Sequence, residues 1–176
     1  MEYFVVTLII ILGIFTGPLE ARYMNFSAIN GTFNSKYMSG IRTWVENGLV
    51  NIEMTTIKTL NYGMRASTSI LLKLENSRKY QTLFSYDIDI CKMLGGMSDS
   101  ILRNWFRNVL KYSNLMENCP VAPAKYVIRN LHLESNNIPP FLRAGDYRFV
   151  VMNYFGKKKT KSFDMVCRFN VDMKIV

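Results

Sequence analysis

The sequence holds few of the residue types that most often carry catalysis or bind metals. Histidine occurs once, as His132, and cysteine occurs three times in 176 residues. No cluster of histidine, cysteine and acidic residues has the spacing of a metal site, and the chain contains neither a glycine-rich dinucleotide motif nor a P-loop. A cysteine–histidine catalytic pair would need a free thiol near His132. We instead expect His132 to lie on the surface of the protein. We therefore predict no catalytic residue, no metal and no cofactor, and we do not expect an enzyme.

Asp87 and Asp89 come closest to a catalytic carboxylate pair. They lie two residues apart on a predicted strand, so their side chains share one face, as a carboxylate pair could. No other feature of the sequence supports this function, and outward aspartates are common where strands end. We expect both residues to have structural roles.

The chain also has no apolar run long enough to cross a membrane. The longest, residues 3–15, has 13 residues, whereas a spanning helix needs about 20. Its length and a plausible cleavage site after Ala21 are typical of a signal peptide, although Glu2 precedes the run and no basic residue does. An uncleaved signal anchor is the alternative. We predict that residues 1–21 are a signal peptide and that residues 22–176 form one secreted domain.

Acidic residues are scarce relative to basic ones. The chain has 22 Lys and Arg against 13 Asp and Glu, a formal charge of +9. Removal of residues 1–21 would take away two glutamates and no basic residue, which leaves 11 acidic residues and a charge of +11. Such a charge favours acidic partners. The basic residues are scattered except at 157–161 (KKKTK), which we expect to be a solvated hairpin tip. Secretion argues against a nucleic-acid partner and leaves a receptor or a membrane surface.

After the first segment, apolar and polar residues mostly alternate with a period of two, which is typical of strands with one face in a core. Asn47-Gly48 is the strongest hairpin signal, because both residues tolerate positive φ. About eight strands joined by short turns predict an antiparallel β-sandwich or barrel in a single domain. The predicted strands cover residues 23–33, 41–47, 50–55, 65–75, 82–90, 125–133, 145–151 and 162–173.

A helical period replaces this alternation from Ser98 onward. Ser98 suits the N-cap position, and Asp99 suits the positive end of a helix. Two adjacent rows of apolar residues then recur every four positions, which predicts an amphipathic helix that covers something apolar. These rows are Ile101, Trp105 and Val109, and Leu102, Phe106 and Leu110.

Three cysteines allow one intramolecular disulfide and one remaining thiol in a secreted protein. Cys91 and Cys119 bracket the predicted helix, but the spacing also allows Cys119 to pair with Cys167. Two sequons, beginning at Asn25 and Asn30, follow the predicted cleavage site, and we predict glycosylation at both.

Several spaced elements, in this order, resemble a large insect family of secreted domains of unknown function, which includes the CheB proteins of gustatory organs. The resemblance covers about residues 22–174, and the family is more remotely similar to the ganglioside activator protein and the ML lipid-recognition fold. The elements are Asp87-x-Asp89-x-Cys91-x-x-Leu94, Tyr112-Ser113-Asn114, Cys119-Pro120 with Tyr126, and Pro139-Pro140 before Gly145-x-Tyr147.

The resemblance implies an ML-like, mostly β protein: an antiparallel sandwich whose sheets splay apart around a lipid, with one amphipathic helix inserted between Cys91 and Cys119. It implies that these two cysteines pair, and it suggests a chemosensory setting. Relatives usually carry a further cysteine on the first strand, where this chain reads YMNFSAIN. We therefore predict that Cys167 has no partner and stays a free thiol. The alternative for it is an intermolecular disulfide.

We predict that a monomer binds a lipid or another hydrophobic small molecule between its sheets. Burying about 12–16 methylene groups is worth roughly 10–13 kcal/mol, which exceeds association costs of several kcal/mol. The alternative is a solid core of the same residues in a protein-interaction module that acts through its basic surface. The predicted lining residues are inward rows of four strands and one face of the helix: Ile70, Leu72, Leu74, Phe84, Tyr86, Trp105, Phe106, Val109, Tyr147, Phe149, Val151, Phe163, Met165 and Phe169.

Overall fold

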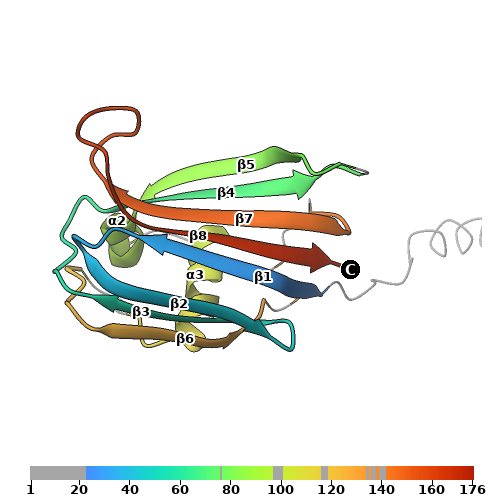
Figure 1. Cartoon of the computed structure of the whole chain (residues 1–176), viewed down its shortest axis with the longest axis horizontal. Helices are drawn as coiled ribbons and strands as arrows, with labels where there is room; N and C mark the ends of the chain where they lie inside the picture. Colours follow the sequence, from blue (N-terminus) through green and yellow to red (C-terminus); the bar gives the residue numbers. More distant parts are fainter. Residues whose placement is uncertain are drawn as a thin grey trace, which may run out of the picture.

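In the computed structural model, the described part of the chain has eight strands, which form two antiparallel sheets (Figure 1). The structure describes residues 23–75, 77–96, 101–115, 119–133, 135, 138 and 142–176, and the side chains of 94–96 and 101–105 are outside this description. The predicted signal peptide therefore lies outside the described residues. The larger sheet has, in spatial order, β1 (Met24–Phe33), β8 (Asp164–Ile175), β7 (Gly145–Phe155), β4 (Arg65–Lys73) and β5 (Tyr80–Asp89). The smaller sheet has β2 (Met38–Glu46), β3 (Leu49–Thr56) and β6 (Lys125–Leu131).

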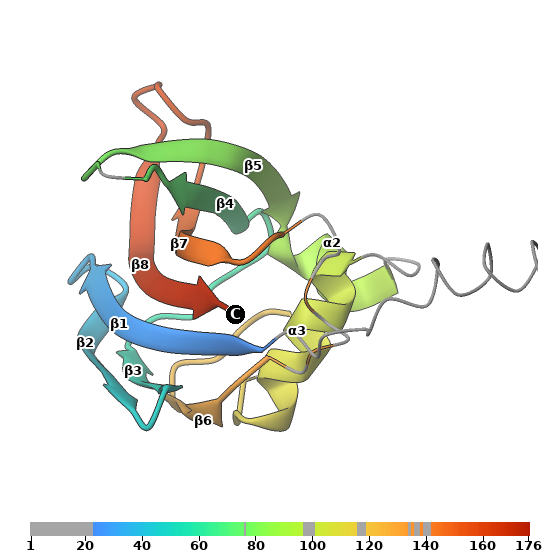
Figure 2. The ribbon, with the colours of Figure 1, turned by 90° about the vertical axis from the view of Figure 1, so that its right-hand side faces the viewer.

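The two sheets pack as an open sandwich. In Figure 2 they approach each other at β1 and β2 and diverge toward β5 and β6. Two helices, α2 (Ile90–Gly96) and α3 (Ile101–Lys111), lie on this divergent side. The predicted sandwich is confirmed, and the alternative of a barrel is wrong because the sheets do not close on each other.

The turn between β2 and β3 follows from its two central residues. Asn47 and Gly48 have φ values of 51° and 74°, the positive pair that a two-residue hairpin turn requires. The turn brings Glu46 opposite Leu49 and continues the antiparallel register along both strands. A side chain at Gly48 would also meet the carboxamide oxygen of Asn25 at 2.0 Å, so this position requires glycine for two reasons.

Helix α2 is a feature that the sequence analysis did not predict. The predicted strand continued to Ile90, but the chain becomes helical there. The Asp89 carboxylate accepts a hydrogen bond from the backbone N–H of Lys92 at 3.0 Å, the geometry of an N-cap residue. Asp89 therefore caps the start of α2.

Helix α3 is the predicted amphipathic helix, although its predicted N-cap, Ser98, lies outside the described residues. Its C-terminal end is fastened to β6. The carboxamide of Asn108 donates to the carbonyl of His132 at 2.7 Å, and the backbone N–H of Arg129 donates to the carbonyl of Tyr112 at 2.8 Å. The Tyr112 hydroxyl also lies 3.0 Å from Nε2 of His132, which is exposed, as predicted. These bonds attach the helix to the smaller sheet.

A disulfide joins Cys91 on α2 to Cys119, with 5.6 Å between their Cα atoms. This confirms the pairing that the family resemblance implied, and the alternative with Cys167 is wrong. Cys167, on β8, forms no disulfide, and its side chain is only 3 % exposed. The segment after Cys119 is held in turn by Leu60, whose backbone exchanges two hydrogen bonds with Val121, at 2.9 and 3.0 Å. The disulfide therefore ties α2 to a loop that rests on the remainder of the sandwich.

Candidate functional site

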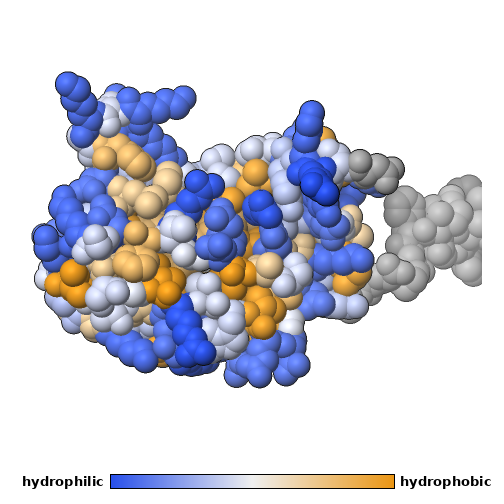
Figure 3. All heavy atoms as spheres, in the orientation of Figure 1, coloured by the Kyte–Doolittle hydropathy of each residue, from blue (hydrophilic) through white to orange (hydrophobic). Residues whose placement is uncertain are grey.

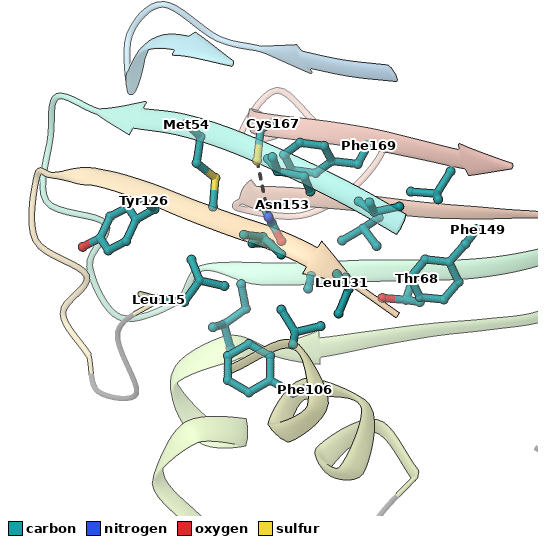
Figure 4. A pocket seen from close by; sticks show the side chains of 18 of the residues that line it. Met54, Thr68, Phe106, Leu115, Tyr126, Leu131, Phe149, Asn153, Cys167 and Phe169 are labelled. Atoms are coloured by element: carbon teal, nitrogen blue, oxygen red, sulfur yellow. Dashed lines mark hydrogen bonds between the residues drawn. The ribbon is translucent and has the colours of Figure 1, made fainter. Parts of the chain in front are cut away.

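An apolar cavity of about 350 Å³ lies between the two sheets (Figure 4). All of the described strands contribute to its lining, and α2 and α3 contribute Ile90, Met93, Phe106 and Val109. Sites for small molecules commonly have volumes of about 300–1,000 Å³ and predominantly apolar walls. The cavity therefore has the size and character of a small-molecule site.

The period-two pattern of the strands builds this lining, because every second side chain points between the sheets. On β8, Cys167, Phe169 and Val171 line the cavity, and on β3, Val50 and Ile52 face them. The alternation in the sequence predicts these faces correctly. The β3 residues, and Tyr126 and Ile128 of β6, were not among the predicted lining residues.

Five of the predicted lining residues do line the cavity. They are Phe106 and Val109 of α3, Phe149 and Val151 of β7, and Phe169 of β8. The side chain of Trp105 lies outside the described residues. The remaining eight are not among the lining residues, and each has a physical reason.

On β4 the predicted face is correct, but the cavity lies at the other end of the strand. Ala66 and Thr68 line it, whereas Ile70 is 2 % exposed in the packed core, Leu72 packs against that core, and Leu74 lies beyond the strand. Tyr147 is likewise buried in the core, and its hydroxyl donates to the carbonyl of Arg143 at 2.8 Å. The small side chains of Ala66 and Thr68 leave room beside β4 for the cavity.

On β5 the predicted residues are on the same face as the cavity-lining Ile88 but farther along the strand from α2, and they do not reach the cavity. Figure 2 shows β5 as the strand farthest from the smaller sheet. Phe84 and Tyr86 stack on each other with 6.3 Å between ring centroids, and Tyr86 is 38 % exposed. Ile88, nearer to α2, is the residue of β5 that lines the cavity.

A β-bulge accounts for the two predictions that fail on β8. Asn153 pairs with Cys167, but the next residue, Tyr154, pairs with Met165. The extra residue is Val166, and it reverses the alternation, so that both Val166 and Cys167 line the cavity and Met165 does not. Phe163 precedes the strand and packs its ring against Tyr154, with centroids 5.3 Å apart.

Cys167 is the one thiol among the described lining residues. Burial raises its pKa to about 11, although a hydrogen bond from the Asn153 carboxamide opposes this shift. The thiolate is the nucleophilic form of cysteine, and at neutral pH this thiol is protonated. Cys167 is therefore suited to lining the cavity rather than to covalent chemistry.

Asp87 is the centre of an ion-pair cluster on the outer side of the larger sheet. Its carboxylate accepts hydrogen bonds from Arg65 at 2.7 Å and from the Tyr154 hydroxyl, and it pairs with Lys158 at 2.9 Å. Burial alone would raise the pKa of Asp87, but the hydrogen bonds from Tyr154, Lys158 and Arg65 outweigh burial and hold this pKa below its usual value. Asp87 thus binds neighbouring strands together, as a structural residue would.

Replacing Asp87 with Asn should lower the free energy of unfolding by about 1–2 kcal/mol at neutral pH, because three donors lose a charged acceptor that is 30 % exposed. Since the folded-state pKa lies below the unfolded value of about 3.9, this stabilisation is complete above about pH 4. It should disappear as the pH falls through the folded-state pKa. Urea denaturation of wild type and variant at several pH values measures the difference.

The matched control for this prediction is Asp146→Asn, because Asp146 forms an exposed pair with Lys73 at 3.9 Å. Such a pair contributes little, so the control should unfold like the wild type at every pH. A difference between wild type and Asp87→Asn that stays constant from neutral to strongly acidic pH would contradict the role assigned to the carboxylate.

The lysine-rich segment 157–161 forms the tip of the hairpin between β7 and β8, as predicted. Figure 3 shows hydrophilic side chains projecting from the sandwich at this tip. Lys157, Lys159 and Lys161 are exposed, whereas Lys158 is half-buried against Asp87 and Ser67. The tip is therefore partly held to the sheet by one of its own lysines.

Other features of the described chain bear on function. None of the helices within the described ranges is long and apolar enough to span a membrane. The described residues also hold no group of three or more His, Cys, Asp or Glu placed to bind a metal ion. Asn25 and Asn30 both lie exposed on β1, and their glycosylation stays a prediction.

The comparison with known families gives one match. Residues 66–149 match a family described as "Protein of unknown function (DUF1091)", which supports an uncharacterised domain family for this part of the chain. The match runs from β4 into β7 and includes both helices and the disulfide. No curated protein matches the chain.

Proposed function

We propose that the protein binds a lipid or another hydrophobic small molecule in the cavity between its two sheets, without catalysing a reaction. The observation that carries this proposal is the cavity of about 350 Å³, which is bounded by every described strand. Its described lining holds no Lys, Arg, His, Asp or Glu. An apolar ligand is the occupant that such walls favour.

The cost of leaving this space empty supports the proposal. In core-mutation series, each Å³ of enclosed cavity left unfilled costs about 24 cal/mol, and this site of about 350 Å³ has an almost wholly apolar lining. Water finds few hydrogen-bonding partners at such walls, so the empty site is unfavourable. A bound apolar molecule would recover much of this free energy.

The ligand's size follows from the volume. At about 20–30 Å³ for each non-hydrogen atom with its hydrogens, the cavity has room for roughly 12–17 of them. A chain of about ten methylene groups would gain roughly 8 kcal/mol from burial, before association costs of several kcal/mol. We expect micromolar or weaker affinity for such a chain. Met54, Met64 and Met93 in the lining can adjust to different ligand shapes.

The helices are the proposed cover of the site. Phe106 and Val109 reach the cavity from α3, which lies where the sheets diverge. The C-terminal end of α3 is fastened to β6, and the Cys91–Cys119 disulfide restrains α2 beside it. We propose that the ligand passes between α3 and the larger sheet, because α3 is attached to the smaller one.

The family resemblance extends this proposal to the biological setting. The arrangement of divergent sheets, a cavity and a disulfide that spans a helix is the one expected from a relationship to the CheB proteins and to the ML lipid-recognition fold. On this basis we propose a secreted, glycosylated monomer, with residues 1–21 removed, that carries its ligand in a chemosensory tissue.

Native mass spectrometry and lipid extraction of protein secreted from insect cells test the proposed function. We expect a co-purified apolar molecule, or saturable micromolar binding of the neutral fluorescent probe N-phenyl-1-naphthylamine by the emptied protein. Protein that is purified empty and also fails to bind this probe would contradict the proposal.

A further inference from the structure

One polar side chain interrupts the apolar lining of the cavity. Asn153 projects from β7, where the alternating row Tyr147, Phe149 and Val151 would place another apolar residue. Its carboxamide N–H donates to the Cys167 sulfur at 3.4 Å (Figure 4). Thiol sulfur is a weak acceptor, so this bond satisfies the amide poorly.

Among the described residues, the carboxamide of Asn153 makes no other hydrogen bond. The Asn153 side chain is half-buried, and the cavity is the space toward which its carboxamide points. The oxygen and the second N–H of the amide are therefore available to a molecule in the cavity.

Two other polar groups of the lining are already bonded to backbone. The Thr56 hydroxyl donates to the carbonyls of Ala122 and Ala124, and the Tyr126 hydroxyl donates to the carbonyl of Ala122 at 2.7 Å. A third polar residue of the lining, Thr68, is a neighbour of Asn153 in the larger sheet. Thr68 pairs with Val151, and Asn153 pairs with Ala66, so Thr68 and Asn153 are diagonal neighbours on the inner face.

Charged ligand groups would find no counterpart here. The described lining includes no charged side chain, although the chain as a whole carries a formal charge of +9. Transfer of a carboxylate or a phosphate into such a space is strongly unfavourable without a paired charge. A hydroxyl or a carbonyl group needs only the donor and acceptor that one carboxamide supplies.

We propose that the cavity selects an uncharged apolar molecule with one small hydrogen-bonding group, a hydroxyl or a carbonyl, which binds the carboxamide of Asn153 beside Thr68. This inference rests on the proposed function. It narrows the ligand class to long-chain alcohols, aldehydes, ketones and esters, and it excludes free fatty acids with an ionised head inside the cavity.

Displacement of N-phenyl-1-naphthylamine by three competitors tests this inference. The competitors are 1-decanol, decanoate above neutral pH, and butylbenzene, which has no hydrogen-bonding group. We expect wild-type protein to bind decanol at least about tenfold more tightly than decanoate. Asn153→Leu, which keeps the volume and removes the amide, should weaken decanol binding about five- to tenfold and leave butylbenzene binding unchanged.

The matched control is Asn170→Leu, the same chemical change on the outer side of β8, where Asn170 accepts a hydrogen bond from Arg168 at 3.3 Å. It should leave all three affinities unchanged. Two results would overturn the inference. One is equal binding of decanol and decanoate by the wild type, and the other is unchanged decanol binding by Asn153→Leu. Failure of the wild type to bind the probe and butylbenzene would instead overturn the proposed function itself.

Discussion

Replacing Ala66 with Trp should abolish ligand uptake while the protein stays folded. The Ala66 side chain lines the cavity and lies opposite Asn153 in the register of β4 and β7. An indole there would occupy much of the space of about 350 Å³. We expect the affinity for N-phenyl-1-naphthylamine to fall about 100-fold or more. Because the indole fills a void instead of an occupied core, the free energy of unfolding should stay constant or rise by about 1 kcal/mol.

The control for this prediction is Ser69→Trp, an equally large change on the opposite face of the same strand. The Ser69 hydroxyl lies exposed, 3.0 Å from that of Ser85, so a tryptophan there would project away from the cavity. Probe titration and thermal unfolding of both variants separate the outcomes. A folded Ala66→Trp variant that binds the probe as the wild type does would show that the ligand site is elsewhere.

Removing the Cys91–Cys119 disulfide with a double Ser substitution should cost about 3–4 kcal/mol of unfolding free energy. The bridge spans 28 residues of sequence, and the chain-entropy model gives this magnitude for such a loop. For a chain of this size the melting temperature should fall by about 10 °C. Calorimetry and urea denaturation measure both quantities.

Cys167→Ala provides the comparison, because Cys167 is a buried cysteine outside any disulfide. Loss of its sulfur should cost only about 1 kcal/mol. The wild type unfolded under reducing conditions should behave as the double variant does. If the double variant is no less stable than Cys167→Ala, the disulfide is not a main support of the fold.

Local patterns were sufficient to predict the strands and, away from the bulge in β8, their inner faces. Asn47-Gly48 predicted the β2–β3 turn because positive φ is a property of the residues themselves. The alternation through Cys167, Phe169 and Val171 predicted the inner face of β8 because a strand has a fixed period. Helix α2 escaped prediction because seven residues are too few for a helical period, and Ile88 and Ile90 continue the alternation of the strand before it.

The position of the cavity along the strands was not predictable in this way. Alternation places Ala66, Thr68, Ile70 and Leu72 on one face, but it does not say where the opposite sheet lies close and where it lies far. The distance between the sheets depends on the bulk of residues from both sheets, such as Ile70 of the larger sheet and Met38 of the smaller one, which are both buried in the core. The bulge at Val166 is equally non-local, since it depends on the pairing of β7 with β8.

Asn153 lies in the cavity at the position where the alternating apolar row of β7 is interrupted by a polar residue. In the sequence it merely ends the row Tyr147, Phe149 and Val151, and it resembles an ordinary polar residue near a strand end. Only the structure shows that the strand continues to Phe155 and that the Asn153 carboxamide lies in an apolar cavity. A polar residue in phase with an inward apolar row is the signal that could have identified it.

The most direct test of the ligand site is a crystal structure of the protein soaked with a long-chain alcohol that carries bromine at its far end. The anomalous signal locates the bromine independently of any assumption about the site. We predict a single strong bromine peak between the two sheets, with the alcohol oxygen within hydrogen-bonding distance of the Asn153 carboxamide. Bromine bound only on the outer surface, or a space between the sheets filled by side chains, would contradict the existence of the site.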